Sequence, residues 1–132
     1  MTYTAVATCG FGLESVLGFE LRHLGLGAQF DGVYISSCYG FRKPDGRFFR
    51  ALLEGQKLDH KKCLMIGNDR HTDIAGARAL GLATLYMHTN ITPPGQEEAD
   101  PGLLPGVAPA QCDRWEFQGS DWAVLAPLIT KL

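Results

Sequence analysis

Apolar residues along the chain alternate between short continuous runs and stretches with helical spacing. The short runs, which are rich in residues that favour strands, are residues 4–8, 30–36, 62–66 and 83–87. The stretches with helical spacing are residues 13–24, the segment after Pro44, and residues 72–80. Strands that alternate with single helices are typical of βαβ units, and nearly all-apolar strands indicate a sheet covered on both faces. We therefore predict an α/β fold, a Rossmann-like three-layer αβα arrangement with a mostly parallel sheet.

The pattern changes after the fourth expected strand. Residues 90–114 are rich in Pro and Gly, and a loop of that length is unusual inside a compact domain, so we expect a mobile excursion there. Residues 115–117 then predict a short edge strand. Ser120 or Asp121 is expected to cap a last helix over residues 122–132, which Pro127 would kink or delay. No internal repeat divides residues 1–132, which we expect to form a single domain.

Composition excludes several classes of protein. The apolar fraction of 45% and charged fraction of 20% are ordinary for a soluble domain, and the net charge of −2 provides no basic field for nucleic acid or a membrane surface. Apolar runs are shorter than the roughly 20 residues that span a bilayer. None of the four cysteines forms a C-x-x-C pair, so we expect free thiols in a reducing cytoplasm rather than a zinc site.

Polar residues gather where the expected strands end, which is where parallel α/β sheets bind ligands. The first strand ends in Thr8, and the second leads through a loop to Lys43. The third ends in Asp69, and Asp73 follows one helical turn later. A hydroxyl and a lysine suit a phosphate group, and two carboxylates suit Mg²⁺, which prefers oxygen ligands. The sequence therefore predicts a site for a phosphate and Mg²⁺ at one edge of the sheet.

Each of these residues also has a purely structural interpretation. Thr8 would only satisfy a turn, and Lys43 would be an ordinary solvated lysine. Asp73 would be the N-cap of the following helix and Asp69 a turn residue. It is the order of the four residues along the alternating elements, rather than any one of them, that favours the site.

The sequence around these residues resembles that of the haloacid dehalogenase (HAD) superfamily. "FDGVYISSCYGFRKPDGRFF" is similar to the third motif of that family, in which a lysine precedes Pro-Asp and opens a helix. "MIGNDRHTDIAGARALGLATLYM" is similar to the fourth motif, with two acids between a strand and a helix. "TAVATCGFG" resembles the second motif, and "FQGSDWAVLAPLITKL" resembles the closing strand and helix. The resemblance covers about residues 4–89 and 115–132.

The resemblance implies a hydrolase of the phosphoric monoester or haloacid type. Lys43 and the two acids favour the first, a Mg²⁺-dependent phosphatase acting on a small phosphorylated substrate, because haloacid chemistry needs no metal. By position, Thr8 would bind phosphate, Lys43 would be a catalytic residue that holds the phosphate and the nucleophile, and Asp69 and Asp73 would hold Mg²⁺. One ambiguity stays open, because Asn68 stands where the first acid of the motif is expected. We favour Asp69 as the ligand, since a carboxylate binds Mg²⁺ more strongly than an amide does.

The first motif of the family, Asp-x-Asp at the end of the central strand, does not occur, and neither does a cap domain. Without the nucleophilic aspartate there is no aspartyl-phosphate intermediate, so we expect a partial core domain without phosphatase activity on its own. A missing central strand would also leave buried backbone groups unpaired. Three solutions stay open: the strand at residues 4–8 moves in, another chain supplies the strand, or the sequence is a piece of a longer protein. We therefore expect a homo-oligomer or a complementing N-terminal segment.

Two other functions compete with this interpretation. Residues 10–15 come close to the G-x-G-x-x-G of a nucleotide-binding Rossmann unit, but Ser15 replaces the third glycine. The other alternative is a non-catalytic member of the family that is kept for protein contacts, which the missing nucleophile favours and the presence of Lys43, Asp69 and Asp73 disfavours.

Overall fold

A parallel three-stranded sheet forms the centre of the molecule. The computed structural model describes residues 14–30, 32, 34–89 and 100–132. The strands are β1 (Leu64–Gly67), β2 (Ala83–His88) and β3 (Arg114–Gln118), in the order β1-β2-β3. In register, Met65 lies beside Thr84 and Leu85 lies beside Trp115. The predicted α/β fold with a parallel sheet is confirmed, and residues 115–117 lie in an edge strand as expected.

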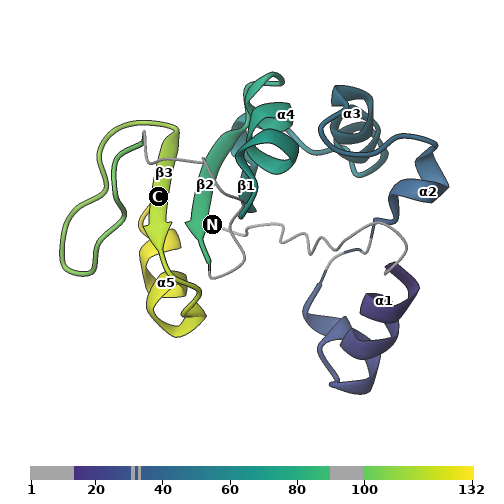
Figure 1. The fold of residues 1–132 in the computed structure, drawn as a ribbon, viewed down its shortest axis with the longest axis horizontal. Helices are drawn as coiled ribbons and strands as arrows, with labels where there is room; N and C mark the ends of the chain where they lie inside the picture. Colours follow the sequence, from purple (N-terminus) through teal and green to yellow (C-terminus); the bar gives the residue numbers. More distant parts are fainter. Residues whose placement is uncertain (1–13, 31, 33, 90–99) are drawn as a thin grey trace.

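Helices cover both faces of this sheet (Figure 1). The helices in the described part of the chain are α1 (Glu14–His23), α2 (Ser36–Tyr39), α3 (Gly46–Gly55), α4 (Ala75–Arg78) and α5 (Trp122–Ile129). Of these, α5 packs on one face of the sheet and α4 on the other, with α3 against α4. Short turns are formed by Gly27–Gln29 and His60–Lys62, and a π-helical turn, Arg70–Ile74, leads directly into α4. Because side chains alternate between the faces of a strand, β2 presents Leu85 and Met87 to α5, and Thr84 and Tyr86 to the opposite face, where α4 lies.

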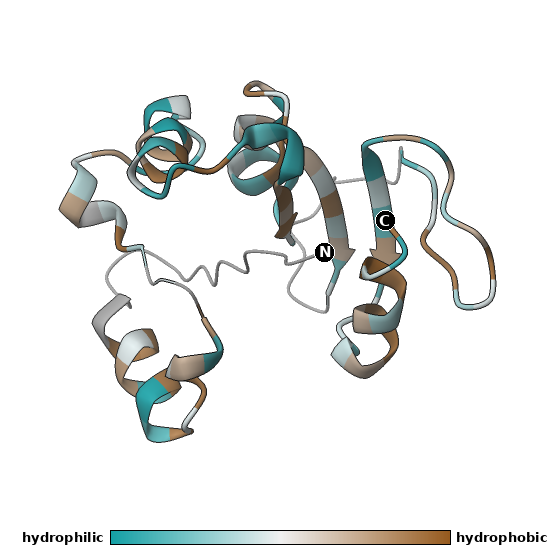
Figure 2. Cartoon of the chain, turned by 180° about the vertical axis from the view of Figure 1, so that it is seen from behind, coloured by the Kyte–Doolittle hydropathy of each residue, from teal (hydrophilic) through white to brown (hydrophobic). Residues whose placement is uncertain are grey.

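The larger apolar core lies between the sheet and α5. Leu85, Met87, Trp115 and Phe117 of β2 and β3 pack against Leu125 and Leu128 of this helix, and all six side chains are buried. Asp121 caps α5 by accepting hydrogen bonds from the backbone N–H groups of Ala123 and Val124, as the sequence predicted for one of two candidate residues. Figure 2 shows apolar segments along β1 and β2, whereas polar and apolar segments alternate along β3.

A second apolar core joins α3 to α4 and β1. Phe48, Phe49 and Leu52 of α3 pack with Met65 and Ala77. Gly76 makes this approach close: a Cβ atom there would lie 2.6 Å from the Phe49 ring and 2.7 Å from the carbonyl oxygen of Pro44. The absence of a side chain at this position therefore brings the segment that contains Lys43 against α4.

Two of the expected elements differ in the structure. Residues 30, 32, 34 and 35 form no regular strand, and the chain turns into α2 at Ser36. Ile35 is extended, but an extended segment becomes a strand only when a neighbouring strand accepts its hydrogen bonds, which local preference does not decide. The helix expected over residues 72–80 begins earlier, at Arg70. The strand expected at residues 4–8 lies outside the described residues.

Residues 100–103 of the expected loop excursion pack against the sheet. The backbone N–H of Glu116 donates to Pro101, and the N–H of Leu103 donates to Glu116, so this segment runs along the outer edge of β3. Leu103 is 1% exposed and belongs to the core under α5. Residues 100–103 are therefore part of the folded domain, while residues 90–99 are outside the described part of the chain.

Helix α1 stands apart from the sheet (Figure 1). Val16, Phe19 and Leu24 are each more than half exposed, whereas Leu21 is buried. The helix thus presents an apolar surface that none of the described elements covers. No helix in the described part of the chain is both long and apolar enough to cross a membrane.

The contact at Gly76 gives a first prediction. Gly76→Ala should lower the free energy of unfolding by about 2 kcal/mol, because the added methyl group meets a backbone carbonyl as well as a ring that would have to move. Urea unfolding measures the change. Gly55→Ala, in the last turn of α3 with open space around it, is the matched control and should leave stability unchanged or raise it slightly. Equal effects of the two substitutions would contradict the close approach.

Candidate functional site

The two candidate acids close a turn at the carboxyl end of β1. Asp69 is the N-cap of the π-helical turn, and its Oδ1 accepts hydrogen bonds from the N–H groups of His71 (2.8 Å) and Thr72 (3.0 Å). Asp73 reaches back, and its Oδ2 accepts a hydrogen bond from the N–H of Asp69 at 3.3 Å. This reciprocal arrangement follows the logic of a capping box, so both carboxylates are fixed against the backbone. We call residues 69–73 the acid turn.

Asp73 is the buried member of the pair, with 4% of its surface exposed. Its carboxylate lies against Gly67, the last residue of β1, where a Cβ atom would come within 2.4–2.6 Å of the Asp73 side chain. Gly67 therefore makes room for a carboxylate directly at the strand end. The turn that carries Asp73 is π-helical, and such turns are uncommon and often occur at functional sites.

Lys43 reaches the acid turn from the loop before α3. Its Nζ forms an ion pair with Oδ1 of Asp73, and the lysine side chain is 18% exposed. Asp45 caps α3 two residues later by accepting from the N–H of Arg47, and this cap fixes where the loop joins the helix. A lysine and an acid 30 residues apart in sequence are thus brought together by the packing of α3 on α4.

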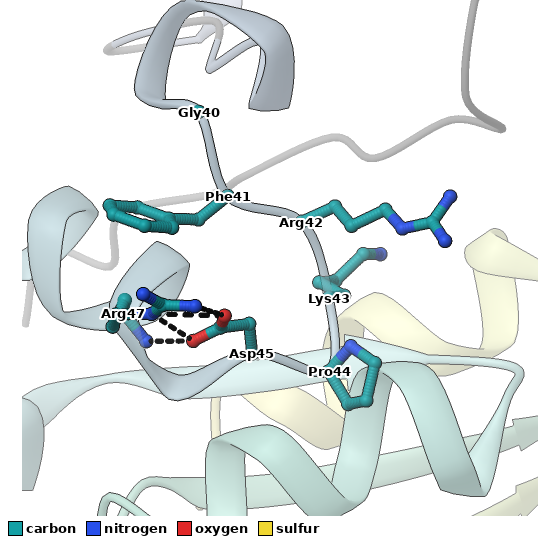
Figure 3. A pocket seen from close by; sticks show the side chains of 7 residues that line it. All are labelled: Gly40, Phe41, Arg42, Lys43, Pro44, Asp45 and Arg47. Atoms are coloured by element: carbon teal, nitrogen blue, oxygen red, sulfur yellow. Dashed lines mark hydrogen bonds and ion pairs between the residues drawn. The ribbon is translucent and has the colours of Figure 1, made fainter.

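Beside Lys43 lies a pocket of about 440 Å³ that is formed by the same loop. Its lining residues are Gly40, Phe41, Arg42, Lys43, Pro44, Asp45 and Arg47. Figure 3 shows Arg42 and Lys43 pointing away from Phe41 and from the Asp45–Arg47 pair. Hydrogen bonds from the Arg47 side chain and backbone lower the pKa of Asp45, so its charge is already balanced. The other two cationic side chains of the lining are Arg42 and Lys43, of which Lys43 is paired with Asp73.

The structure brings together three of the four predicted site residues, Lys43, Asp69 and Asp73. Thr8 lies outside the described residues. The capping role that we considered for Asp73 belongs to Asp69 instead. Asn68, the alternative to Asp69, donates a hydrogen bond from Nδ2 to the Thr89 hydroxyl at 3.4 Å, so its amide turns toward the end of β2.

These residues fit part of a magnesium site. The acid turn offers two carboxylates, those of Asp69 and Asp73. Among the described residues, no third His, Cys, Asp or Glu joins them to form a group that could hold a metal ion. Mg²⁺ is commonly held by only one or two carboxylates, with waters and substrate phosphate completing its octahedron. The space that Gly67 leaves for Asp73 at the strand end agrees with this donor set. Lys43 is the cation that contacts Asp73 in the structure.

Comparison with known families identifies the class of protein. The HAD-hydrolase-like family matches residues 40–110, more than half of the chain, and this match includes Lys43 and the whole acid turn. A phosphoserine phosphatase of Thermus thermophilus is 30% identical over 102 residues, which cover 77% of this chain and 41% of that enzyme. The chain belongs to the HAD-like hydrolase superfamily and corresponds to a C-terminal part of its core domain. It spans less than half the length of the curated relatives that it matches.

Solved structures agree with the family. YfnB of Bacillus subtilis, in a crystal form bound to magnesium, is 30% identical with a TM-score of 0.54, and the match covers 58% of this chain and 34% of YfnB. A HAD phosphatase of Thermococcus onnurineus has a TM-score of 0.66 at 18% identity, covering 98% of this chain and 51% of that protein. The second likeness supports the fold alone.

The N-terminal residues match a different family. Residues 4–32 match the RlmL ferredoxin-like domain, while the HAD match begins only at residue 40. Thr8 and α1 both lie in this segment, and α1 is the helix that stands apart from the sheet with exposed apolar residues. The phosphate-binding role expected of Thr8 therefore stays a prediction that competes with a second family assignment.

The ion pair at the acid turn gives a second prediction. Lys43→Met should lower the free energy of unfolding by about 3 kcal/mol, because it leaves the Asp73 carboxylate buried without its counter-ion. Urea unfolding tests it. Arg47→Met, which breaks an exposed pair on the same loop, is the control and should change stability little. Two equally mild variants would show that Lys43 and Asp73 do not depend on each other.

Proposed function

We propose that this chain carries the magnesium-binding and phosphate-binding half of a phosphatase-type active site for a small phosphate monoester. The observation that carries the proposal is the contact of Lys43 with Asp73 beside Asp69, at the carboxyl end of a parallel strand. The family membership and the phosphatases among its relatives support the same reaction. Finer substrate identity would depend on segments outside this chain.

Each residue has a distinct task in such a site. Asp69 and Asp73 would hold Mg²⁺, which supplies charge neutralisation for a transferring phosphoryl group. Lys43, held in place by Asp73, would place a fixed ammonium beside the phosphate oxygens, where negative charge develops. The open pocket beside Lys43, with Arg42 exposed at its side, would admit the phosphate end of the substrate.

The nucleophile would come from a complementing segment. Among the described elements, β1 pairs only with β2, so its other edge is open to a further strand. A strand that ends in Asp-x-Asp and pairs with this edge would bring its first carboxylate beside Lys43 and the acid turn. A preceding part of a longer chain, or a second polypeptide, would serve equally well.

The three described cysteines are free thiols, which supports a reducing cytoplasm as the compartment in which such a phosphatase would act.

A non-catalytic role is the second candidate. The exposed apolar surface of α1 favours it, because large apolar residues gathered on one helix often mark a protein contact. In that case Lys43 and Asp73 would serve only to fix the loop on the domain.

The metal-binding role of Asp69 can be separated from its capping role. Asn is as good an N-cap as Asp, so Asp69→Asn should preserve the turn while it removes the charge that binds Mg²⁺. We expect unchanged urea stability and at least about tenfold weaker Mg²⁺ binding, followed by amide NMR shifts during MgCl2 titration.

Asp121→Asn is the matched control, because it makes the same change in the cap of α5, away from the acid turn. It should leave both properties unchanged. Mg²⁺ binding that survives Asp69→Asn would assign Asp69 to capping alone and would leave the amide of Asn68 as the alternative ligand.

Activity provides the fourth prediction. The chain alone should not hydrolyse p-nitrophenyl phosphate with MgCl2, whereas co-expression with a strand segment ending in Asp-x-Asp should produce hydrolysis that Asp69→Asn abolishes. The same segment with its first aspartate replaced by asparagine is the control. Hydrolysis by the chain alone that also disappears in Asp69→Asn would overturn the proposed need for a complementing segment. No hydrolysis by a folded complex would favour the non-catalytic role.

A further inference from the structure

A buried cluster of charged side chains adjoins the acid turn, on the face of the sheet that α4 covers. Its members are Arg70, Arg78, His88, Asp100 and Glu116, and we call it the Arg70 cluster. Glu116 is 2% exposed, and the side chain of Asp100 is 8% exposed. None of these residues was a candidate from the sequence. Two of them, Asp100 and Glu116, follow the segment 90–99 and are far from the acid turn along the chain.

Arg70 is the residue of the acid turn that enters this cluster. Its guanidinium forms an ion pair with Glu116, and its Nη1 donates to Oδ2 of Asp100 at 3.3 Å. The same group lies over the ring of Tyr86, with 4.2 Å between Cζ and the ring centroid. A buried aromatic face and two carboxylates thus surround a side chain whose backbone directly follows Asp69.

Arg78, at the other end of the helical segment, also contacts the carboxylate of Asp100. It forms an ion pair with Asp100, and its Nε donates to the Thr84 hydroxyl at 3.0 Å. Arg70 begins the π-helical turn, and Arg78 ends α4. Because one carboxylate holds both ends, the helical segment cannot rotate about its axis without breaking an ion pair.

The remaining contacts fix the two carboxylates themselves. Asp100 donates its backbone N–H to Oε1 of Glu116 at 3.1 Å, and His88 contacts Oε2 of Glu116 at 2.9 Å. The cluster thus combines the two arginines and His88 with two carboxylates. Residues 101–103, which pair with β3, hold Asp100 at this position.

We propose that the Arg70 cluster is a positioning device that sets the orientation of the acid turn for its cation. Arg70, Asp100 and Glu116 do not touch the metal or substrate; they act through the backbone of the turn. The inference rests on the proposed magnesium site. It extends that site to the segment after residue 99, whose docking on β3 places Asp100 between the two arginines. Residues behind metal ligands commonly change metal affinity by about 10-fold to 100-fold when they are substituted.

The test compares Asp100→Asn with Asp113→Asn in the full chain. Asp113 is an exposed carboxylate next to β3 that pairs only loosely with Arg114, so the same chemical change there leaves the Arg70 cluster intact. We expect Asp100→Asn to weaken Mg²⁺ binding at least about fivefold, with Asp113→Asn unchanged. Arg70→Lys, which keeps the charge, should retain more affinity than Arg70→Met. Asp121→Ala, which loosens α5 without touching Arg70, controls for a general loss of stability.

A second measurement keeps the inference separate from the proposed function. In metal-free protein, hydrogen exchange at the amides of His71, Thr72 and Asp73 should quicken at least about tenfold in Asp100→Asn and Arg70→Met, but not in Asp121→Ala. If the unsubstituted chain binds no Mg²⁺, the proposed function fails, and exchange alone decides the inference. Exchange and affinity that respond no more in the cluster variants than in Asp121→Ala would overturn it.

Discussion

The ion pair between Lys43 and Asp73 is the contact on which the arrangement of the site depends. Placing a carboxylate at 4% exposure is costly unless a counter-ion and hydrogen bonds compensate for lost water. Lys43 supplies the counter-ion, and the N–H of Asp69 supplies a hydrogen bond. Neither is possible without the two glycines: Gly67 leaves room for the carboxylate, and Gly76 lets the loop that carries Lys43 approach α4. One electrostatic requirement therefore accounts for both glycines.

The same requirement explains which parts of the site the sequence could predict. Asp69 and Asp73 are close in sequence, so a strand followed by a helical turn already places them together. Lys43 is 30 residues away, and the sequence predicted its position from the rule that carboxyl ends of parallel strands meet at one edge and from the family resemblance. The strand expected to lead to Lys43 does not form at residues 30, 32, 34 and 35, so the packing of α3 on α4 brings the lysine to the site instead. The exchange of the capping role between Asp73 and Asp69 was not predictable, because it depends on a π-helical turn that begins at Arg70.

Local sequence patterns did not predict the structure at residues 30–36 or the burial of the Arg70 cluster. Val33, Tyr34 and Ile35 favour a strand, but pairing requires a neighbour, and α2 begins at Ser36 instead. In the cluster, Glu116 lies between Trp115 and Phe117 in a strand that alternates polar and apolar residues, a pattern that indicates a solvent-facing side chain. It is buried because Arg70 and His88 come to it from other elements. Only tertiary contacts reveal such charges.

The two edges of the sheet differ in whether a described segment pairs with them, and this difference connects the fold to the proposed function. The outer edge of β3 is covered by residues 101–103, which exchange hydrogen bonds with Glu116 and carry Asp100 into the cluster behind the acid turn. The outer edge of β1 pairs with no described strand, and it lies next to Gly67 and the acid turn. Because a strand edge without a neighbour favours pairing, the edge of β1 that pairs with no described strand and the two carboxylates at its end would accept the same addition. A single strand ending in a carboxylate would satisfy both.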